Sequence, residues 1–347
     1  MTFNDTFLRA IRNEKVDHVP VWYMRQAGRY QASYRKIKEK HSLMQICEIP
    51  DLCAEVTISP VRDHNVDAAI LYSDIMIPVK PMGVDVDIVA GVGPVIDNPI
   101  RKLADVQALR PLEAEEDLPN TMETIRILRG ELKVPLIGFA GAPFTLASYM
   151  VEGRPSREYH KTKQMMYAAP DVWFALMDKL GDMVITYMKA QVAAGTQAIQ
   201  IFDSWIGALS PRDYEYYVFP TMKRIFEGLR EVPVPKIYFG VNTGHLLNLW
   251  KELPIDVIGV DWRVPLNLAS ERVGDKFALQ GNLDPVYLLA PFEVLQEEVK
   301  RIIDLGLQHG GGYVFNLGHG LFPEAPEDVV TKLTAFIHEY SAGRLRG

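Results

Sequence analysis

The chain has 347 residues, of which 48% are hydrophobic and 23% are charged, and its formal net charge is −7 at pH 7. This composition predicts a globular protein with a substantial core and argues against disordered or low-complexity segments. The negative net charge argues against a nucleic-acid-binding surface, and it requires that any anionic ligand be attracted by a local cluster of cations in a recessed site.

The start of the chain and its two cysteines predict a location in the cytoplasm. Residues 1–5 lead directly into an amphipathic run, without the basic and apolar segment of an export signal. The longest uncharged stretch, Pro135 to Val151, is interrupted by glycines and prolines, so it predicts a buried strand plus a loop and no contact with a membrane. Cys47 and Cys53 have no metal-ligand neighbours, and two cysteines in a chain of this length indicate a reducing compartment.

Eight short apolar runs recur along the chain with helix-length amphipathic segments between them. They are Val19–Tyr23, Asp67–Tyr72, Leu136–Ala140, Ala198–Phe202, Lys236–Phe239, Val257–Val260, Phe277–Gln280 and Tyr313–Asn316. Runs without polar alternation are typical of parallel strands that are covered on both faces. The pattern predicts the α/β class and a closed (β/α)8 TIM barrel that forms a single domain over residues 1–347, in preference to an open doubly wound sheet.

Local signals mark the ends of several helices. Ser210 followed by Pro211 and Asp213 predicts a helix that runs to Arg230, and residues 324–328 predict the start of the last helix in the same way. Residues 84–93 have the period of a strand and contain glycines, so they predict an extra hairpin after the second barrel strand.

The segment Met24 to Tyr30 follows the first apolar run and contains two arginines four residues apart, Arg25 and Arg29. Arginine binds carboxylates through a planar fork and keeps its charge at any physiological pH. Gly28 between them allows the backbone to turn where a side chain would obstruct it. The segment predicts a site for an organic acid, and the alternative is that both arginines form ordinary surface ion pairs.

Polar residues follow every apolar run, at the end of the predicted barrel where catalytic groups gather. In chain order, from the first run to the last, they are Arg25, Arg29, Ser73, Asp74, Tyr149, Asp203, Ser204, Asn242, Thr243, Asp261, Trp262, Asn282, Asp284 and His319. The alternative for Asp74, Asp203 and Asp284 is that each caps a following helix, and the alternative for His319 is that its loop satisfies it.

Several motifs that indicate cofactors are incomplete. His309 with the three glycines that follow it is not accompanied by the Gly-x-Ser-x-Gly motif of esterases, so it predicts a turn between a helix and the last strand. Gly91 and Gly93 lack the third glycine of a dinucleotide fingerprint, and no His-x-x-x-His pair occurs. The sequence therefore predicts neither a nucleotide cofactor nor a metal ligand set.

Five segments in the same order and at the spacing of the whole chain resemble the uroporphyrinogen decarboxylase family. They are residues 24–30, 72–75, 141–153, 202–204 and 316–320. The resemblance implies a one-domain barrel that forms a homodimer and removes carbon dioxide from the four acetate arms of uroporphyrinogen. The product is coproporphyrinogen, formed in the cytosolic route to porphyrins and heme, and no cofactor or metal is implied.

The resemblance also carries residue roles onto this sequence. It implies a substrate-binding set made of Arg25, Gln26, Ala27, Gly28, Arg29, Tyr34, Asp74, Tyr149, Ser204 and His319. Within this set Asp74, Arg25, His319 and Tyr149 are implied to take part in catalysis. Tyr34 stands where the family usually has phenylalanine and Lys38 where it often has arginine, which affects fine contacts.

The implied chemistry accounts for these residue types. Decarboxylation of an acetate leaves an electron pair, and the attached pyrrole accepts it once a ring carbon is protonated, so the substrate acts as its own cofactor. Asp74 would accept hydrogen bonds from the pyrrole N–H groups and stabilise the cation. The proton donor stays open between Arg25 and His319.

Two other function classes stay open. The same barrel family includes methyltransferases that hold zinc through a His-x-Cys pair and a later cysteine, but this chain has no cysteine after Cys53. A non-catalytic tetrapyrrole-binding protein would need the arginines and the acceptor without every polar group, and turnover in a metal-free assay would distinguish it.

Overall fold

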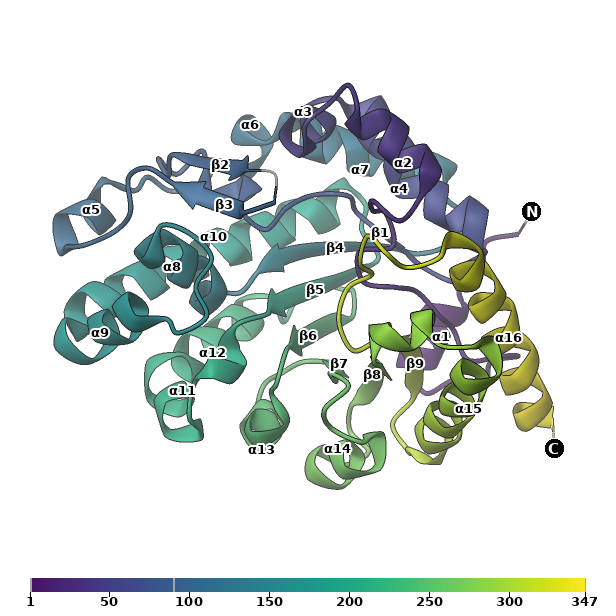
Figure 1. Ribbon diagram of the computed structural model, residues 1–347. Helices are drawn as coiled ribbons and strands as arrows, with labels where there is room; N and C mark the ends of the chain where they lie inside the picture. Colours follow the sequence, from purple (N-terminus) through teal and green to yellow (C-terminus); the bar gives the residue numbers. More distant parts are fainter. Residues whose placement is uncertain (1, 90, 347) are drawn as a thin grey trace.

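The computed structural model describes residues 2–89 and 91–346. Its main sheet has seven parallel strands in the order β1-β4-β5-β6-β7-β8-β9 and curls around a central axis, with helices on the outside (Figure 1). The strands are β1 (Ala69–Ile70), β4 (Leu136–Gly141), β5 (Ala198–Asp203), β6 (Lys236–Gly240), β7 (Val257–Gly259), β8 (Ala278–Leu283) and β9 (Tyr313–Leu317). The predicted barrel is confirmed, with seven of the eight runs forming regular strands.

The first predicted strand, Val19–Tyr23, closes the barrel as an irregular segment. It forms a single parallel bridge between Val21 and Phe315, and on its other side the N–H of Asp67 donates to the carbonyl of Val21 at 2.8 Å. Two features prevent a regular ladder. Pro20 has no N–H to donate, and the N–H of Val21 donates to the Asp67 carboxylate at 2.9 Å instead of to a strand.

The helices follow the strands around the barrel. They are α1 (Thr6–Ile11), α2 (Ala32–Lys38), α3 (Leu43–Glu48), α4 (Pro50–His64), α5 (Leu103–Ala108), α6 (Ala114–Asp117), α7 (Pro119–Glu131), α8 (Pro143–Glu152), α9 (His160–Ala168), α10 (Pro170–Ala194), α11 (Pro211–Tyr217), α12 (Phe219–Gly228), α13 (Leu247–Trp250), α14 (Leu266–Val273), α15 (Phe292–Gln308) and α16 (Glu327–Arg346). Short 3-10 helices are η1 (Ile77–Val79), η2 (Ile206–Ala208), η3 (Gly244–Leu246) and η4 (Pro285–Leu289). Among the described residues, none of these helices has the length and apolar character needed to cross a membrane.

Two local predictions were wrong. The stretch after β4 is the helix α8 and not a loop, because Pro143 stands in its first turn, where a missing N–H costs nothing. The predicted helix from Pro211 to Arg230 is two helices, because Pro220 has no N–H to donate to the preceding turn and the backbone leaves helical geometry at Val218. The N-cap at Ser210 is confirmed, since its hydroxyl accepts the N–H of Asp213 at 3.1 Å.

The predicted extra hairpin after the second barrel strand is confirmed. It consists of β2 (Val86–Val89) and β3 (Gly93–Ile96), which pair antiparallel, and Ala90 in its turn lies outside the described residues. The N–H of Ile96 donates to the carbonyl of Gly153 at 2.8 Å, so the hairpin is held against the end of α8 (Figure 1). Because the hairpin follows β1 and α8 follows β4, both lie at the carboxyl end of the barrel.

Candidate active site

The arginine segment lies at the mouth of the barrel, between the ends of the first and last strands. Arg25 has a left-handed backbone (φ 59°), and its side chain packs so closely on Gly320 that a Cβ there would overlap its Cγ and Cδ. Arg25 is the left-handed residue of the segment, and Gly28 begins a turn in which the N–H of Gln31 donates to the Gly28 carbonyl at 3.0 Å. Gly28 also permits a close approach, since a Cβ on it would lie 3.3 Å from the Arg25 carbonyl oxygen.

The four predicted catalytic residues gather around the charge of Arg25. Burial raises the pKa of Asp74, and the charge of Arg25 partly opposes this. Burial and the charge of Asp74 raise the pKa of Tyr149, again against Arg25. Burial, Arg25 and Arg263 lower the pKa of His319 to about 4. One guanidinium therefore acts on groups that follow β1, β4 and β9.

Asp74 has one oxygen fixed and one oxygen available. Its Oδ1 accepts the N–H of Met76 at 2.8 Å, which is the turn-capping contact that the alternative interpretation expected. Within residues 2–89 and 91–346 this is the single hydrogen bond of the carboxylate, and the side chain is only partly exposed. The capping contact thus holds Oδ1 and leaves Oδ2 without a hydrogen-bond partner among the described residues.

His319 is a neutral hydrogen-bond donor in this site. The N–H of Gly320 donates to its Nδ1 at 2.7 Å, which leaves the ring proton on Nε2. Because its pKa is lowered to about 4, the imidazole is uncharged near neutral pH. The lowered pKa disfavours the charged imidazolium in this structure, and Arg25 and His319 both remain candidates for the proton donor.

A second group lies around Arg29. Burial raises the pKa of Tyr34 and lowers that of Lys38, and the charge of Arg29 lowers both. The Tyr34 hydroxyl lies 2.6 Å from that of Tyr72, two residues before Asp74, so it links the arginine segment to the loop that carries the carboxylate. In the described part of the chain neither Arg25 nor Arg29 forms an ion pair, so the structure does not show the surface ion pairs of the alternative interpretation.

Three other predicted binding residues, Gln26, Ala27 and Ser204, are buried or half-buried. Gln26 is buried, and its side chain accepts the N–H of Tyr23 at 3.1 Å and donates to the carbonyl of Ala68 at 3.1 Å, so it holds the segment in place. Ala27 packs beside the small apolar cluster that contains Tyr34. Ser204 is half-buried in the turn directly after β5.

Asp203 and Trp205 extend the site beyond the predicted set. Asp203 is buried, and its carboxylate accepts the hydroxyls of Thr145 and Tyr238, each at 2.7 Å. Burial raises the pKa of Asp203 to about 6, and these hydrogen bonds oppose the shift. The backbone N–H of Trp205 donates to Thr145 Oγ1 at 3.3 Å, and the centroid of its ring lies 3.9 Å from that of the Tyr149 ring. Asp203 thus ties β5 to the helix that carries Tyr149.

The capping alternative for the other aspartates has a mixed outcome. Asp284 caps η4 by accepting the N–H of Val286 at 3.0 Å, whereas Asp203 caps no helix. A buried network such as that of Asp203 leaves one signal in the sequence, an acidic residue at the end of an apolar run. This signal does not reveal the hydroxyl partners, because they come from elements far along the chain.

The whole chain matches known decarboxylases. The family model for uroporphyrinogen decarboxylase (URO-D) matches residues 2–340. The uroporphyrinogen decarboxylases of Bacillus cereus (strain B4264) and Bacillus thuringiensis (strain Al Hakam) are each 59% identical to it over 345 residues, which cover 99% of this chain and 99% of each relative. The chain belongs to the uroporphyrinogen decarboxylase family. The predicted resemblance is thereby confirmed.

Solved structures with the same fold include enzymes outside the decarboxylases. A methyltransferase from Methanosarcina mazei superposes with a TM-score of 0.80 at 20% identity and covers 98% of this chain and 99% of its own. A B12-independent methionine synthase from Shewanella sp. W3-18-1 gives a TM-score of 0.60 at 11% identity, with 88% and 90% covered. At these identities the likeness shows the barrel fold and nothing about activity.

Proposed function

We propose that this protein is a carboxy-lyase that removes carbon dioxide from the acetate side chains of uroporphyrinogen, leaves methyl groups and forms coproporphyrinogen. The observation that carries the proposal is the carboxylate of Asp74, which has one oxygen anchored on Met76 and the other without a protein partner, beside Arg25. The membership of the family and the 59% identity to uroporphyrinogen decarboxylases along the whole chain support the choice of substrate.

In the proposed reaction Asp74 stabilises a cation that exists only along the reaction path. Protonation of a pyrrole carbon makes the ring an electron sink, the bond to the carboxylate breaks, and its electron pair moves into the ring as carbon dioxide leaves. The exocyclic methylene that remains takes up a proton and becomes the methyl group, and the ring carbon loses the proton that it first gained. A carboxylate that accepts the pyrrole N–H groups in a partly buried mouth stabilises this charge by an amount of order a few kcal/mol. The raised pKa of Asp74 reflects the same low-dielectric surroundings.

The remaining residues bind and orient the carboxylate arms. Arg25 and Arg29 would hold the reacting arm and its neighbour through charge-assisted hydrogen bonds. Tyr149, Ser204 and neutral His319 would donate hydrogen bonds to other arms. Gln26, Ala27 and Gly28 shape the segment that presents the arginines, and Tyr34 connects it to the Asp74 loop.

The proposal includes one barrel domain over the whole chain, a homodimer in solution and a location in the cytoplasm. The domain and the location also rest on the sequence patterns, whereas the homodimer rests on the family resemblance alone. Analytical ultracentrifugation at micromolar concentration tests the dimer. A sedimentation coefficient of a monomer that persists as the concentration rises would contradict that part of the proposal.

Turnover of uroporphyrinogen in a metal-free assay is the experiment that tests the function. We expect coproporphyrinogen to accumulate, and we expect the rate to be unchanged after exhaustive chelation. A rate that is abolished by chelation and restored by zinc would favour the methyltransferase class. Binding of the tetrapyrrole without turnover would indicate a carrier.

A further inference from the structure

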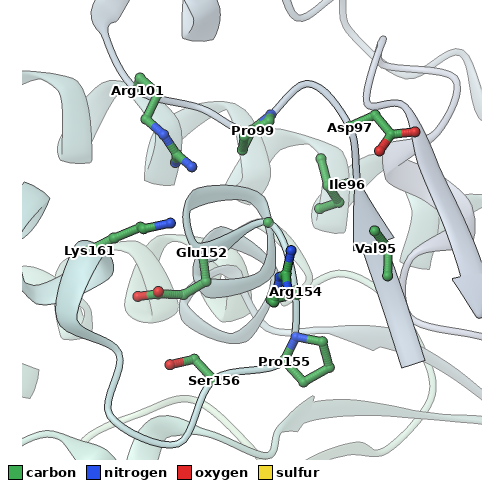
Figure 2. Close-up of a pocket in the computed structure, with 11 residues that line it drawn as sticks. Val95, Ile96, Asp97, Pro99, Arg101, Glu152, Arg154, Pro155, Ser156 and Lys161 are labelled. Carbon is green, nitrogen blue, oxygen red and sulfur yellow. The ribbon is translucent and has the colours of Figure 1, made fainter. Parts of the chain in front are cut away.

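A second recess with a cationic lining lies at the same end of the barrel as the candidate active site. Its volume is about 460 Å³, within the usual range of small-molecule sites. One wall is residues 95–101, from the end of β3 onward, and the other is residues 152–161, from the end of α8 to the start of α9 (Figure 2). None of the predicted site residues lines it. Because these two connections follow β1 and β4, the recess lies on the carboxyl face of the barrel.

Three cationic side chains extend into this recess. Figure 2 shows Arg101 on one wall of the recess and Arg154 and Lys161 on the other. Arg154 and Lys161 are exposed, and within the described part of the chain neither pairs with a carboxylate. Like charges that converge without counter-ions repel one another, so an anion bound between them would relieve that repulsion.

The two acidic residues at the recess, Asp97 and Glu152, offset two of the three positive charges but form no ion pair with them among the described residues, so the lining keeps an excess of one positive charge. Glu152 is directed to the start of α9, where its carboxylate accepts the N–H of Thr162 at 2.9 Å and the Thr162 hydroxyl at 3.0 Å. Asp97 is exposed at the edge and forms no ion pair within residues 2–89 and 91–346. The lining therefore keeps an excess of positive charge in a chain whose net charge is −7.

The walls of the recess are held together by the backbone. The N–H of Ile96 donates to the Gly153 carbonyl at 2.8 Å, and the N–H of Ile100 donates to the Met150 carbonyl at 2.9 Å. The guanidinium of Arg101 donates to the carbonyl of Ile100 at 2.9 Å and to that of Val151. The cations are therefore carried by a fixed frame that includes the last turn of α8, the helix of Tyr149.

We propose that this recess is an auxiliary carboxylate-binding site, in which Arg154 and Lys161 bind a carboxylate arm of the tetrapyrrole substrate. The inference rests on the proposed function. A negatively charged protein and a polyanionic substrate repel each other at long range, and a local cationic recess beside the mouth raises the rate of productive encounter.

Removal of two charges at the recess tests this inference. Arg154→Ala/Lys161→Ala is compared with Lys133→Ala/Lys189→Ala, which removes the same charge next to the amino ends of β4 and β5. We expect the recess variant to lower kcat/KM about threefold or more at low ionic strength, with kcat unchanged and the loss shrinking as salt screens the charges. The control variant should keep the kcat/KM of the unmodified protein.

Binding of citrate, a tricarboxylate probe, separates this inference from the proposed function. Because Arg25 and Arg29 also bind carboxylates under the proposed function, the titration follows the NMR signals of residues 95–101 and 152–161. We expect citrate to shift these signals in the unmodified protein and in the control variant, and to bind there at least tenfold more weakly in the recess variant. Equal kcat/KM or equal citrate affinity for the two double variants would overturn the inference. Absence of turnover by the unmodified protein would overturn the proposed function instead, while the citrate comparison would still decide whether the recess binds carboxylates.

Discussion

Two aspartates on either side of β1 have opposite surroundings. Asp67, before the strand, accepts hydrogen bonds from Asn4 at 3.0 Å, His18 at 3.0 Å, His338 at 2.7 Å and the N–H of Val21 at 2.9 Å. Burial alone would raise the pKa of Asp67, but the two histidines lower it well below its usual value. Asp74, after the strand, has one hydrogen bond, and burial raises its pKa.

The different surroundings of Asp67 and Asp74 indicate different roles for the two ends of the barrel. At the amino end a buried carboxylate has its lone pairs filled by groups from the N-terminal segment and from α16, so it ties the two ends of the chain to the barrel. At the carboxyl end the partly buried Asp74 keeps one oxygen without a hydrogen-bond partner among the described residues, and the buried Asp203 has a raised pKa. Such costs are typical of functional positions. We therefore propose that Asp67 at the amino end of the barrel contributes to stability and that Asp74 and Asp203 at the carboxyl end contribute to the chemistry.

Asp67→Asn is expected to have the largest effect on stability. An asparagine cannot accept from all four donors, so the free energy of unfolding at pH 7 should fall by about 3 kcal/mol. Because the native pKa of Asp67 is lowered, its contribution is present above pH 4 and is lost as the pH falls toward the native value. Urea unfolding at pH 7 and below pH 4 should thus show a gap between the two proteins that narrows in acid.

Enzyme activity is the control measurement for the Asp67→Asn variant. The folded Asp67→Asn protein should keep its kcat within about twofold, because Asp67 lies at the opposite end of β1 from the mouth. A variant that is as stable as the parent but inactive would reverse the roles that we assign to the two ends.

Arg29→Ala should have the next largest effect, on substrate binding. The loss of a charge-assisted contact to a carboxylate typically costs about 1.5 to 3 kcal/mol, so KM for uroporphyrinogen should rise by more than tenfold. Arg29→Lys keeps the charge without the planar fork, so its KM should lie between those of the unmodified protein and Arg29→Ala. Lys38→Ala should change KM little. An unchanged KM in Arg29→Ala would remove Arg29 from the anion site.

Asp203→Asn should have a smaller effect, of about tenfold in kcat, because Asp203 acts on Tyr149 through Thr145 and Trp205. The pKa of Asp203 is raised to about 6, so its protonation below that pH removes an acceptor and should reduce kcat in the parent. The same raised pKa means that ionisation destabilises the folded state as the pH rises from about 4 to 6.

The measurement for Asp203 is the pH dependence of kcat and of urea unfolding between pH 5 and 8. The parent should lose kcat and gain stability as the pH falls through 6, relative to Asp203→Asn, which lacks the titrating group. Parallel pH profiles for the two proteins would contradict the assigned role of Asp203.

Much of the fold could be predicted from the sequence because parallel strands buried on both faces leave continuous apolar runs. The run Ala198–Phe202 agrees with β5 to within one residue. Val19–Tyr23 has the same apolar character, but its backbone donor goes to a side chain, and that depends on Asp67, more than forty residues further along the chain. Apolar pattern alone therefore located the segment without showing that its ladder is incomplete.

The site was predicted in outline for the same reason. Position after a strand places Arg25, Asp74 and His319 at one end of the barrel, and the charge of Arg25 acts on both of the others. The protonation state of His319 was not predictable, because it depends on the neighbouring N–H of Gly320 and on burial beside two arginines. Spacing gives location, whereas the pKa follows from contacts made only after folding.

The measurement that tests the central claim most directly is steady-state turnover of uroporphyrinogen by Asp74→Asn, alongside equilibrium binding of coproporphyrinogen. Asparagine keeps the size and the capping oxygen, because it caps turns about as well as aspartate, but it removes the charge that would stabilise the cation. We predict a fall in kcat of about a hundredfold or more, with product binding and the urea midpoint nearly unchanged. A folded variant with near-normal kcat would contradict the account and leave Asp74 as a turn cap.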